Sequence, residues 1–251
     1  MSKIVIFFIL ILPLFAKEPN FGKYDGSAVI LDLNSLEKTV FGSRADERLS
    51  PCSTFKILNS MIALDSKAVK NEDEVIKWDG VKREYDVWNK DHTMRSAIAV
   101  SAVWFYQELA RRIGEKRMKE YVKRVKYGNA DTSSTLTDFW LGNGSLKISL
   151  NEQVDFLSRL MRNELEFSQH VIGTVKDIII LEKSDTYLLG GKTGSCGGVG
   201  WFVGFMQNHD KTTVFAFNIK GEGANGAEAK KIAFEYLKTR INAKFEDIKS
   251  E

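Results

Sequence analysis

SPCSTFKIL, residues 50–58, is the stretch from which the fold and the chemistry of this chain are inferred. Its serine–proline pair is typical of a helix start, with Ser50 as the cap and Pro51 at the first helical position. Ser53 and Lys56 would then lie on one helix face, within reach of each other. We expect the helix N-terminus and the apolar neighbours to lower the pKa of the Lys56 amine. Because a neutral amine can take a proton from a serine, the stretch predicts a nucleophile and its base.

A second motif supports this interpretation over the alternative of a capping serine with a solvated lysine. The spacing alone is weak, because Ser35 and Lys38 repeat it in a predicted hairpin. Lys192, Thr193 and Gly194, however, end a predicted strand and follow two glycines. Such a strand edge offers an anionic acyl substrate a cation, a hydroxyl and N–H groups, although an ordinary turn is the alternative. The pairing of S-x-x-K with a later K-T-G is known in penicillin-recognising enzymes.

The pattern of strands and helices predicts an α+β protein. Residues 26–33 and 38–42 are typical of a β-hairpin, and four β-rich runs follow at residues 177–183, 186–194, 199–207 and 212–219. Helical spacing of apolar residues covers most of the middle of the chain and its C-terminal end. We therefore expect an antiparallel sheet built from both chain ends, about residues 17–50 and 175–251. The C-terminal helix would cover this sheet, and a helical lobe, about residues 51–174, would be inserted.

Composition excludes several classes of protein. The 251 residues are 43% apolar and 27% charged, which is ordinary for a globular protein. A net charge of +3 does not indicate a nucleic-acid partner. The three histidines lack the spacing of a zinc site, so we expect no metal. Two cysteines, Cys52 and Cys196, permit one disulfide, and whether they meet is left open.

The first residues have the layout of a secretory signal peptide. A lysine is followed by an uncharged run from Ile4 to Leu12, then Pro13 and the small residue Ala16. The run is short for a membrane span, although an uncleaved anchor is the alternative. We expect residues 1–16 to be removed and the mature domain, residues 17–251, to be exported to the periplasm, with no membrane attachment afterwards.

Further motifs follow one another along the chain in the order that one protein family shows. They are WDG (78–80), WN (88–89), SAVWFYQELARRIG (101–114), YGN (127–129), FWL (139–141) and GWFVG (200–204). Together with STFK (53–56) and KTG (192–194), they make the chain resemble the class D β-lactamases, or oxacillinases, from about residue 26 to 240. The resemblance implies the β-lactamase/penicillin-binding-protein-like fold. It also implies a serine hydrolase that opens the β-lactam ring of penicillins and confers antibiotic resistance.

The resemblance implies a role for each matching residue around the nucleophile. Ser53 would be acylated, and Lys56 would be carboxylated by carbon dioxide to N6-carboxylysine, the general base for acylation and deacylation. Val103 would supply an apolar wall, Trp140 would donate its indole N–H to the carbamate, and Leu141 would limit water entry. No cofactor other than carbon dioxide or bicarbonate is implied.

Further matching residues would contact the substrate or shape the site. Ser101 would relay a proton to the lactam nitrogen, and it is also a candidate helix cap. Lys192 and Thr193 would bind the substrate carboxylate, next to Gly194. The Ser195 N–H would join that of Ser53 in an oxyanion hole. The two remaining matches, Tyr127 and Asn129, would form a structural turn at the edge of the site.

Two departures from the family leave questions open. Cys52 stands where the family usually has alanine, and its role is not explained. The family commonly has an arginine on the C-terminal helix, whereas this chain offers Lys230 or Lys231. The competing functions are a β-lactam receptor domain and a penicillin-binding peptidase, which acylate without fast deacylation. The sequence does not decide the substrate range beyond penicillins, or whether the protein is a monomer or a homodimer.

Overall fold

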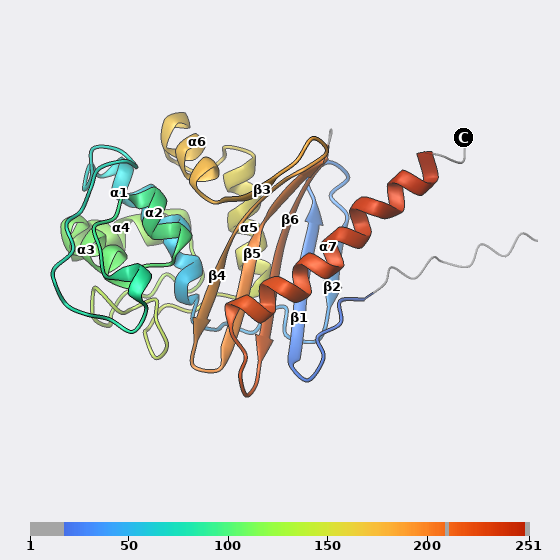
Figure 1. The fold of residues 1–251 in the computed structure, drawn as a ribbon, viewed down its shortest axis with the longest axis horizontal. Coiled ribbons are helices and arrows are strands. Elements are labelled where there is room, and N and C mark those ends of the chain that lie inside the picture. Colours follow the sequence, from blue (N-terminus) through green and yellow to red (C-terminus); the bar gives the residue numbers. More distant parts are fainter. Residues whose placement is uncertain (1–17, 209–210, 249–251) are drawn as a thin grey trace, which may run out of the picture.

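A six-stranded antiparallel sheet forms the centre of the protein (Figure 1). The computed structural model describes residues 18–208 and 211–248. The strand order is β2-β1-β6-β5-β4-β3, so strands from both chain ends are neighbours, as predicted. The strands are β1 (Asp25–Asp32), β2 (Lys38–Phe41), β3 (Ile180–Lys183), β4 (Leu188–Cys196), β5 (Val199–Asn208) and β6 (Lys211–Lys220).

Residues of β6 alternate between the two faces of the sheet, and both faces are buried there. A continuous run of apolar residues is therefore what this strand requires. Val214 and Ala216 belong to one hydrophobic cluster, whereas Phe215 and Phe217 belong to another. Helix α7 (Gly226–Ile248) covers the second face and crosses the sheet in Figure 1, as the sequence predicts. Its buried residues there are Ala229, Ile232, Ala233, Tyr236 and Leu237.

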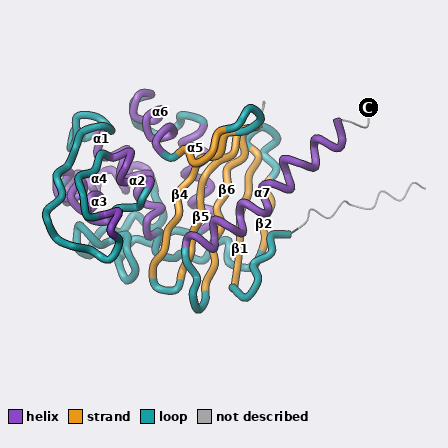
Figure 2. Tube along the Cα trace, viewed as in Figure 1, coloured by secondary structure: helices purple, strands orange, loops and turns teal. Residues whose placement is uncertain are grey.

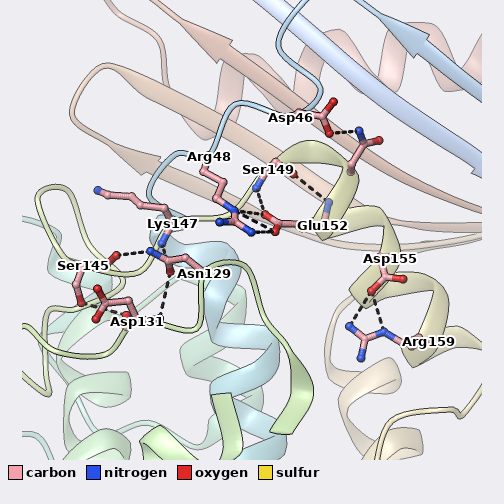
Figure 3. Close-up of polar contacts among 11 residues, drawn as sticks. Asp46, Arg48, Asn129, Asp131, Ser145, Lys147, Ser149, Glu152, Asp155 and Arg159 are labelled. Carbon is pink, nitrogen blue, oxygen red and sulfur yellow. Dashed lines mark hydrogen bonds and ion pairs between the residues drawn. The ribbon is translucent and has the colours of Figure 1, made fainter. Parts of the chain in front are cut away.

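Helix α5 (Leu150–Met161) covers the opposite face of the sheet and was not assigned to that position from the sequence. It begins at a capping box, in which the Ser149 hydroxyl accepts the N–H of Glu152 and the carboxylate accepts the N–H of Ser149 (Figure 3). Arg48 forms an ion pair with the same carboxylate at 2.5 Å. Together these contacts fix the start of α5 to the segment that leads into residues 50–58.

The helical lobe lies at one end of the sheet, beside β4 (Figures 1 and 2). Gly114, at a φ of 81°, ends one of its helices, as the sequence predicts for this glycine. The segments of this lobe are the 3₁₀ turns η1 (Cys52–Phe55) and η2 (Asp86–Trp88) and the helices α1 (Lys56–Asp65), α2 (Met94–Ala99), α3 (Val103–Ile113), α4 (Glu115–Val125) and α6 (Gln169–Ile178).

Three local predictions are wrong. Ser50 does not cap a helix, because its hydroxyl donates to the Trp140 carbonyl at 3.1 Å and the segment after Pro51 is a 3₁₀ turn. Ser101 is not a cap either, since Ala102 occupies the N-cap position of α3 and makes no side-chain cap bond. The strand predicted from residue 177 begins at Ile180, because helical apolar spacing extends α6 through Ile178.

The predicted signal peptide, residues 1–16, lies outside the residues that the structure describes. Within residues 18–208 and 211–248, no helix combines the length and the apolar character that crossing a membrane requires.

Candidate active site

Ser53, Lys56 and Ser101 meet where η1 passes into α1. Nζ of Lys56 lies 2.6 Å from Oγ of Ser53 and 3.3 Å from Oγ of Ser101. Ser53 belongs to η1 and Lys56 begins α1, so the spacing of three residues brings them together as predicted. The sequence separates Ser101 from Lys56 by 45 residues, and the tertiary fold closes that gap.

The amine of Lys56 is fully buried, with no exposed surface. Burial, with a smaller effect from the charge of Lys192, lowers the pKa of Lys56 well below its usual range. The amine also lies 5.4 Å from the ring centre of Tyr106, a buried residue of α3. A neutral amine beside a serine hydroxyl is the state in which a lysine can accept a proton or react with an electrophile.

Ser101 reaches the lysine from an unusual backbone conformation. It links α2 to α3 at a φ of 57°, in the left-handed region that few residues other than glycine adopt. Its N–H donates to the Ile98 carbonyl at 3.2 Å, and the next N–H, of Ala102, donates to the Ala97 carbonyl at 2.9 Å. These bonds close the last turn of α2 and hold the serine side chain against Lys56.

Trp140 is buried beside the nucleophile turn. Its indole stacks on Phe55 of η1, with ring centres 5.4 Å apart and planes inclined by 27°. Its carbonyl accepts the N–H of Cys52 at 2.9 Å. Among the described residues, the buried indole N–H has no hydrogen-bond partner, which is uncommon for a buried donor. Such an N–H is free to donate to a group that the described side chains do not supply.

Val103 and Leu141 are close in the chain to Ser101 and Trp140, and neither is fully buried. Val103 occupies the first turn of α3, two residues after Ser101, and is partly exposed. Leu141 is also partly buried and packs against the main hydrophobic cluster, next to Trp140 in the chain.

Strand β4 supplies the other wall of the site. Lys192 is 5% exposed, and its Nζ donates to the hydroxyl of Thr193 at 3.3 Å. Burial, with a smaller effect from the charge of Lys230, lowers the pKa of Lys192 to about 7. Gly194 brings the strand close to η1, since a Cβ there would lie 2.9 Å from the Pro51 carbonyl oxygen. Substitution of this glycine would therefore push the strand away from the nucleophile turn.

The end of β4 is attached to the start of α7. The Ser195 hydroxyl accepts the N–H of Gly226 at 2.7 Å. One turn further, Lys230 lines a cavity of about 110 Å³ together with Lys192 and Thr193. Lys231 does not line this cavity and is exposed. Of the two lysines that the sequence offered in place of arginine, the structure brings Lys230 to the K-T-G strand.

Tyr127 and Asn129 occupy different environments. Asn129 is part of a turn held by hydrogen bonds, in which its amide donates to the Ser145 carbonyl and its side-chain oxygen accepts the N–H of Lys147 (Figure 3). Gly128 adopts a φ of 56° in this turn, close to the Lys147 backbone. Tyr127 is instead a core residue, edge-on to Phe55 with ring centres 5.7 Å apart.

Comparison with known proteins identifies the family. Residues 23–238 match the model of the penicillin binding protein transpeptidase domain. The chain is 44% identical over 225 residues to the probable β-lactamase YbxI of Bacillus subtilis, and the match covers 88% of this chain and 83% of the relative. A solved class D β-lactamase from Bacillus subtilis superposes with a TM-score of 0.86 at 42% identity, covering 91% of this chain and 97% of that one. The chain belongs to the class D β-lactamases.

Class D β-lactamases are hydrolases, and this chain shares the fold of one further kind of protein. The C-terminal domain of the Bacillus licheniformis BlaR penicillin receptor superposes with a TM-score of 0.82 at 38% identity. That match covers 86% of this chain and 90% of the receptor domain. The fold alone therefore does not separate an enzyme from a receptor, and it is the membership of the class D β-lactamases that identifies the chain as a hydrolase.

Two contacts of this class D β-lactamase go beyond the sequence analysis. The pairing of the two cysteines was left open, and the contact of an aromatic ring with the Lys56 amine was not predicted. Cys52 and Cys196 form a disulfide with their Cα atoms 5.9 Å apart, which answers the question of whether they meet. Tyr106 lies under the lysine amine, and the only signal for it is its place one helical turn after Val103. Within the described residues, no group of three or more His, Cys, Asp or Glu side chains could hold a metal ion.

Proposed function

We propose that this class D β-lactamase hydrolyses penicillins through an acyl-enzyme on Ser53 and thereby confers resistance to them. One observation carries the proposal: a buried lysine of lowered pKa lies 2.6 Å from the Ser53 hydroxyl. A lysine in that state can activate the serine, either directly or after modification.

We further propose that Lys56 is carboxylated in the working enzyme. The neutral amine adds to carbon dioxide and loses one proton, which leaves a carbamate on Nζ. This group supplies a general base for both acylation and deacylation. Two features support the proposal, namely the lowered pKa of Lys56 and the unpartnered, buried indole N–H of Trp140 among the described residues. Trp140 would donate to the carbamate, and Val103 and Leu141 would limit its exposure to water.

The other residues divide into those that move protons and those that hold the substrate. Ser53 Oγ attacks the lactam carbonyl while the N–H groups of Ser53 and Ser195 stabilise the developing oxyanion. Ser101, 3.3 Å from Lys56 Nζ, passes the proton to the lactam nitrogen as its bond to carbon breaks. The substrate carboxylate lies against Lys192, Thr193 and Lys230, which line one cavity. Hydrogen bonds between these cations and a carboxylate would be charge-assisted and therefore stronger than neutral ones.

Intact-protein mass spectrometry with a penicillin tests the proposal. We expect an adduct on Ser53 that forms and decays within one turnover, and a Lys56→Ala variant whose adduct persists. An adduct on Ser53 that persists in the wild-type protein would make the chain a receptor domain or a penicillin-binding peptidase. No adduct at all would contradict every function considered.

Carboxylation has a separate test that does not depend on turnover. In a buffer of ¹³C-bicarbonate, we expect one carbamate carbon resonance that is absent from the Lys56→Ala variant. If the wild-type protein gives no such resonance at saturating bicarbonate, the base is the free amine.

We also propose that the enzyme is exported and acts in the periplasm. The signal-peptide pattern of residues 1–16 supports export. A disulfide between Cys52 and Cys196 supports an oxidising compartment, because the cytosol keeps thiols reduced. N-terminal sequencing of the secreted protein should give a start near Lys17.

A further inference from the structure

We propose that the Cys52–Cys196 disulfide is a positioning element of the active site that sets the spacing between the Ser53 and Ser195 N–H groups. The inference rests on the proposed role of these two groups as oxyanion donors. It predicts that the chemical steps of this enzyme depend on the redox state of a bond that touches no substrate.

The two cysteines are the chain neighbours of the two donors. Cys52 directly precedes Ser53 at the start of η1, and Cys196 directly follows Ser195 at the end of β4. The disulfide joins them with a Cα–Cα distance of 5.9 Å. An oxyanion hole requires two N–H groups at hydrogen-bond distance from one oxygen, so their spacing must be fixed within a fraction of an ångström. The disulfide is the covalent link between the segments that carry them.

The backbone conformation of Cys52 is unfavourable and requires stabilising contacts, of which the disulfide is one. Cys52 adopts a φ of 52°, a left-handed conformation that is costly for a residue with a Cβ and persists where the surroundings enforce it. Its side chain has no exposed surface, and its N–H donates to the Trp140 carbonyl. The direction of the next N–H, that of Ser53, depends directly on this conformation. The disulfide therefore acts on the donor through the strained residue beside it.

On the side of the nucleophile, the end of β4 is held by the close approach of Gly194 to η1 and by β5, whose Trp201 indole N–H donates to the Ser50 carbonyl at 2.9 Å. Strand β3 pairs with β4 only as far as Gly190, so among the described strands the rest of β4 pairs with β5 alone. The turn that follows Cys196 consists of Gly197 and Gly198, both at positive φ. Gly226 of α7 binds the Ser195 hydroxyl, but this bond comes from α7 and not from η1. Breaking the disulfide would remove the covalent link to η1 at the last residue of β4, next to Ser195, where the two following glycines allow movement.

The bond is open to reduction from one side. Cys196 is partly exposed, whereas Cys52 is fully buried, so an external thiolate attacks the Cys196 sulfur. Dithiothreitol supplies two electrons and two protons, closes into its cyclic disulfide and leaves two protein thiols. Reoxidation reverses the change.

The experiment compares the oxidised enzyme, the dithiothreitol-reduced enzyme and the Cys52→Ala/Cys196→Ala variant. Two quantities are measured: the single-turnover rate of acylation by a penicillin, and the affinity for phenylboronic acid, whose tetrahedral adduct on Ser53 places an oxygen in the oxyanion hole. Loss of one oxyanion donor lowers rates by about 10²–10³-fold, and displacement should cost less. We expect both quantities to fall about tenfold without the disulfide, and reoxidation of the reduced enzyme to restore them.

Controls separate positioning from stability and from the carbamate. Ile232→Ala, in the cluster between the sheet and α7, lowers the melting temperature but should leave acylation within twofold of wild type. Added bicarbonate should not rescue the disulfide variant. Rescue by bicarbonate would overturn the proposal, as would a folded variant with unchanged acylation and boronate affinity. Unfolding of both disulfide-free forms would also overturn it, in favour of a plain stabilising bond. A wild-type enzyme that forms no Ser53 adduct would instead contradict the proposed function.

Discussion

Lys56 and Lys192 are both buried at the same site, and the charge of Lys192 contributes to lowering the pKa of Lys56. The two amines belong to different halves of the molecule, one at the start of α1 and the other on β4. Burying two like-charged groups together is costly, so at least one is neutral in the working range of pH. This difference agrees with the proposed roles, in which Lys56 acts as the base and Lys192 binds the substrate carboxylate.

Substitution of Trp140 by phenylalanine should weaken the carbamate while keeping the stack on Phe55. A hydrogen bond to a charged group contributes about 1.5–3 kcal/mol, so we expect kcat at ambient bicarbonate to fall by about 10–150-fold. Saturating bicarbonate should recover part of the loss. Trp104→Phe is the matched control, because its buried indole donates only to the Trp88 carbonyl, at 2.7 Å. Equal bicarbonate dependence in both variants would contradict the assigned role of Trp140.

Removal of the charge of Lys230 should weaken substrate binding. Lys230 lines the cavity with Lys192 and Thr193, so Lys230→Ala should raise KM for a penicillin about tenfold with kcat little changed, the loss of one charge-assisted contact. Lys231→Ala removes the same charge from the neighbouring, exposed position and should change KM less than twofold. Similar effects of the two variants would point to the net charge of α7 and not to a specific contact.

The pH dependence should report the state of Lys192. Its pKa is about 7, so the cation that binds the substrate carboxylate is lost as pH rises through 7, and kcat/KM should fall. The pH at which kcat/KM falls should be higher in the Lys230→Ala variant, because the charge of Lys230 contributes to lowering the pKa of Lys192. Between about pH 7 and 10.5 the unfolded state binds the extra proton, so this lysine makes the folded state more stable as pH rises. A flat kcat/KM from pH 6 to 9 would contradict the assignment.

Gly173 offers a way to stabilise the enzyme without touching the site. It lies inside α6, and a Cβ there would meet no atom within 4 Å. Alanine should therefore raise the free energy of unfolding by about 0.5–1 kcal/mol, measured as a higher urea midpoint at an unchanged m-value. Gly128→Ala is the contrasting variant, because its φ of 56° and a Cβ 2.1 Å from the Lys147 oxygen should destabilise the protein.

Local patterns in the sequence were enough for the strands, most of the helices and the approach of Lys56 to Ser53. The alternation of β6 and the spacing of three residues are both local signals, and the structure has them as expected. The predicted helix cap at Ser50 was wrong because a tertiary hydrogen bond, from its hydroxyl to the Trp140 carbonyl, replaced the local one.

Contacts between distant segments could not be read in the same way. The pairing of Cys52 with Cys196 spans 144 residues, and the choice of Lys230 over Lys231 depends on the rotation of α7 over β4. The left-handed backbone of Ser101 and Cys52 has no sequence signal at all, because neither residue type favours it. These features arise from the packing of the two halves and not from either half alone.

The interleaved strand order has a consequence for how the enzyme is made. Asp25 in β1 pairs with Lys220 in β6, so the first strand has no central partner until nearly the whole chain has been synthesised. Such long-range pairing slows folding and exposes unpaired strands meanwhile. A truncated chain that ends before β6 would keep β4 but would lack the strand that joins β1 to β5 in the sheet. Activity therefore requires a chain that has been synthesised nearly to its end and has closed the sheet around β6.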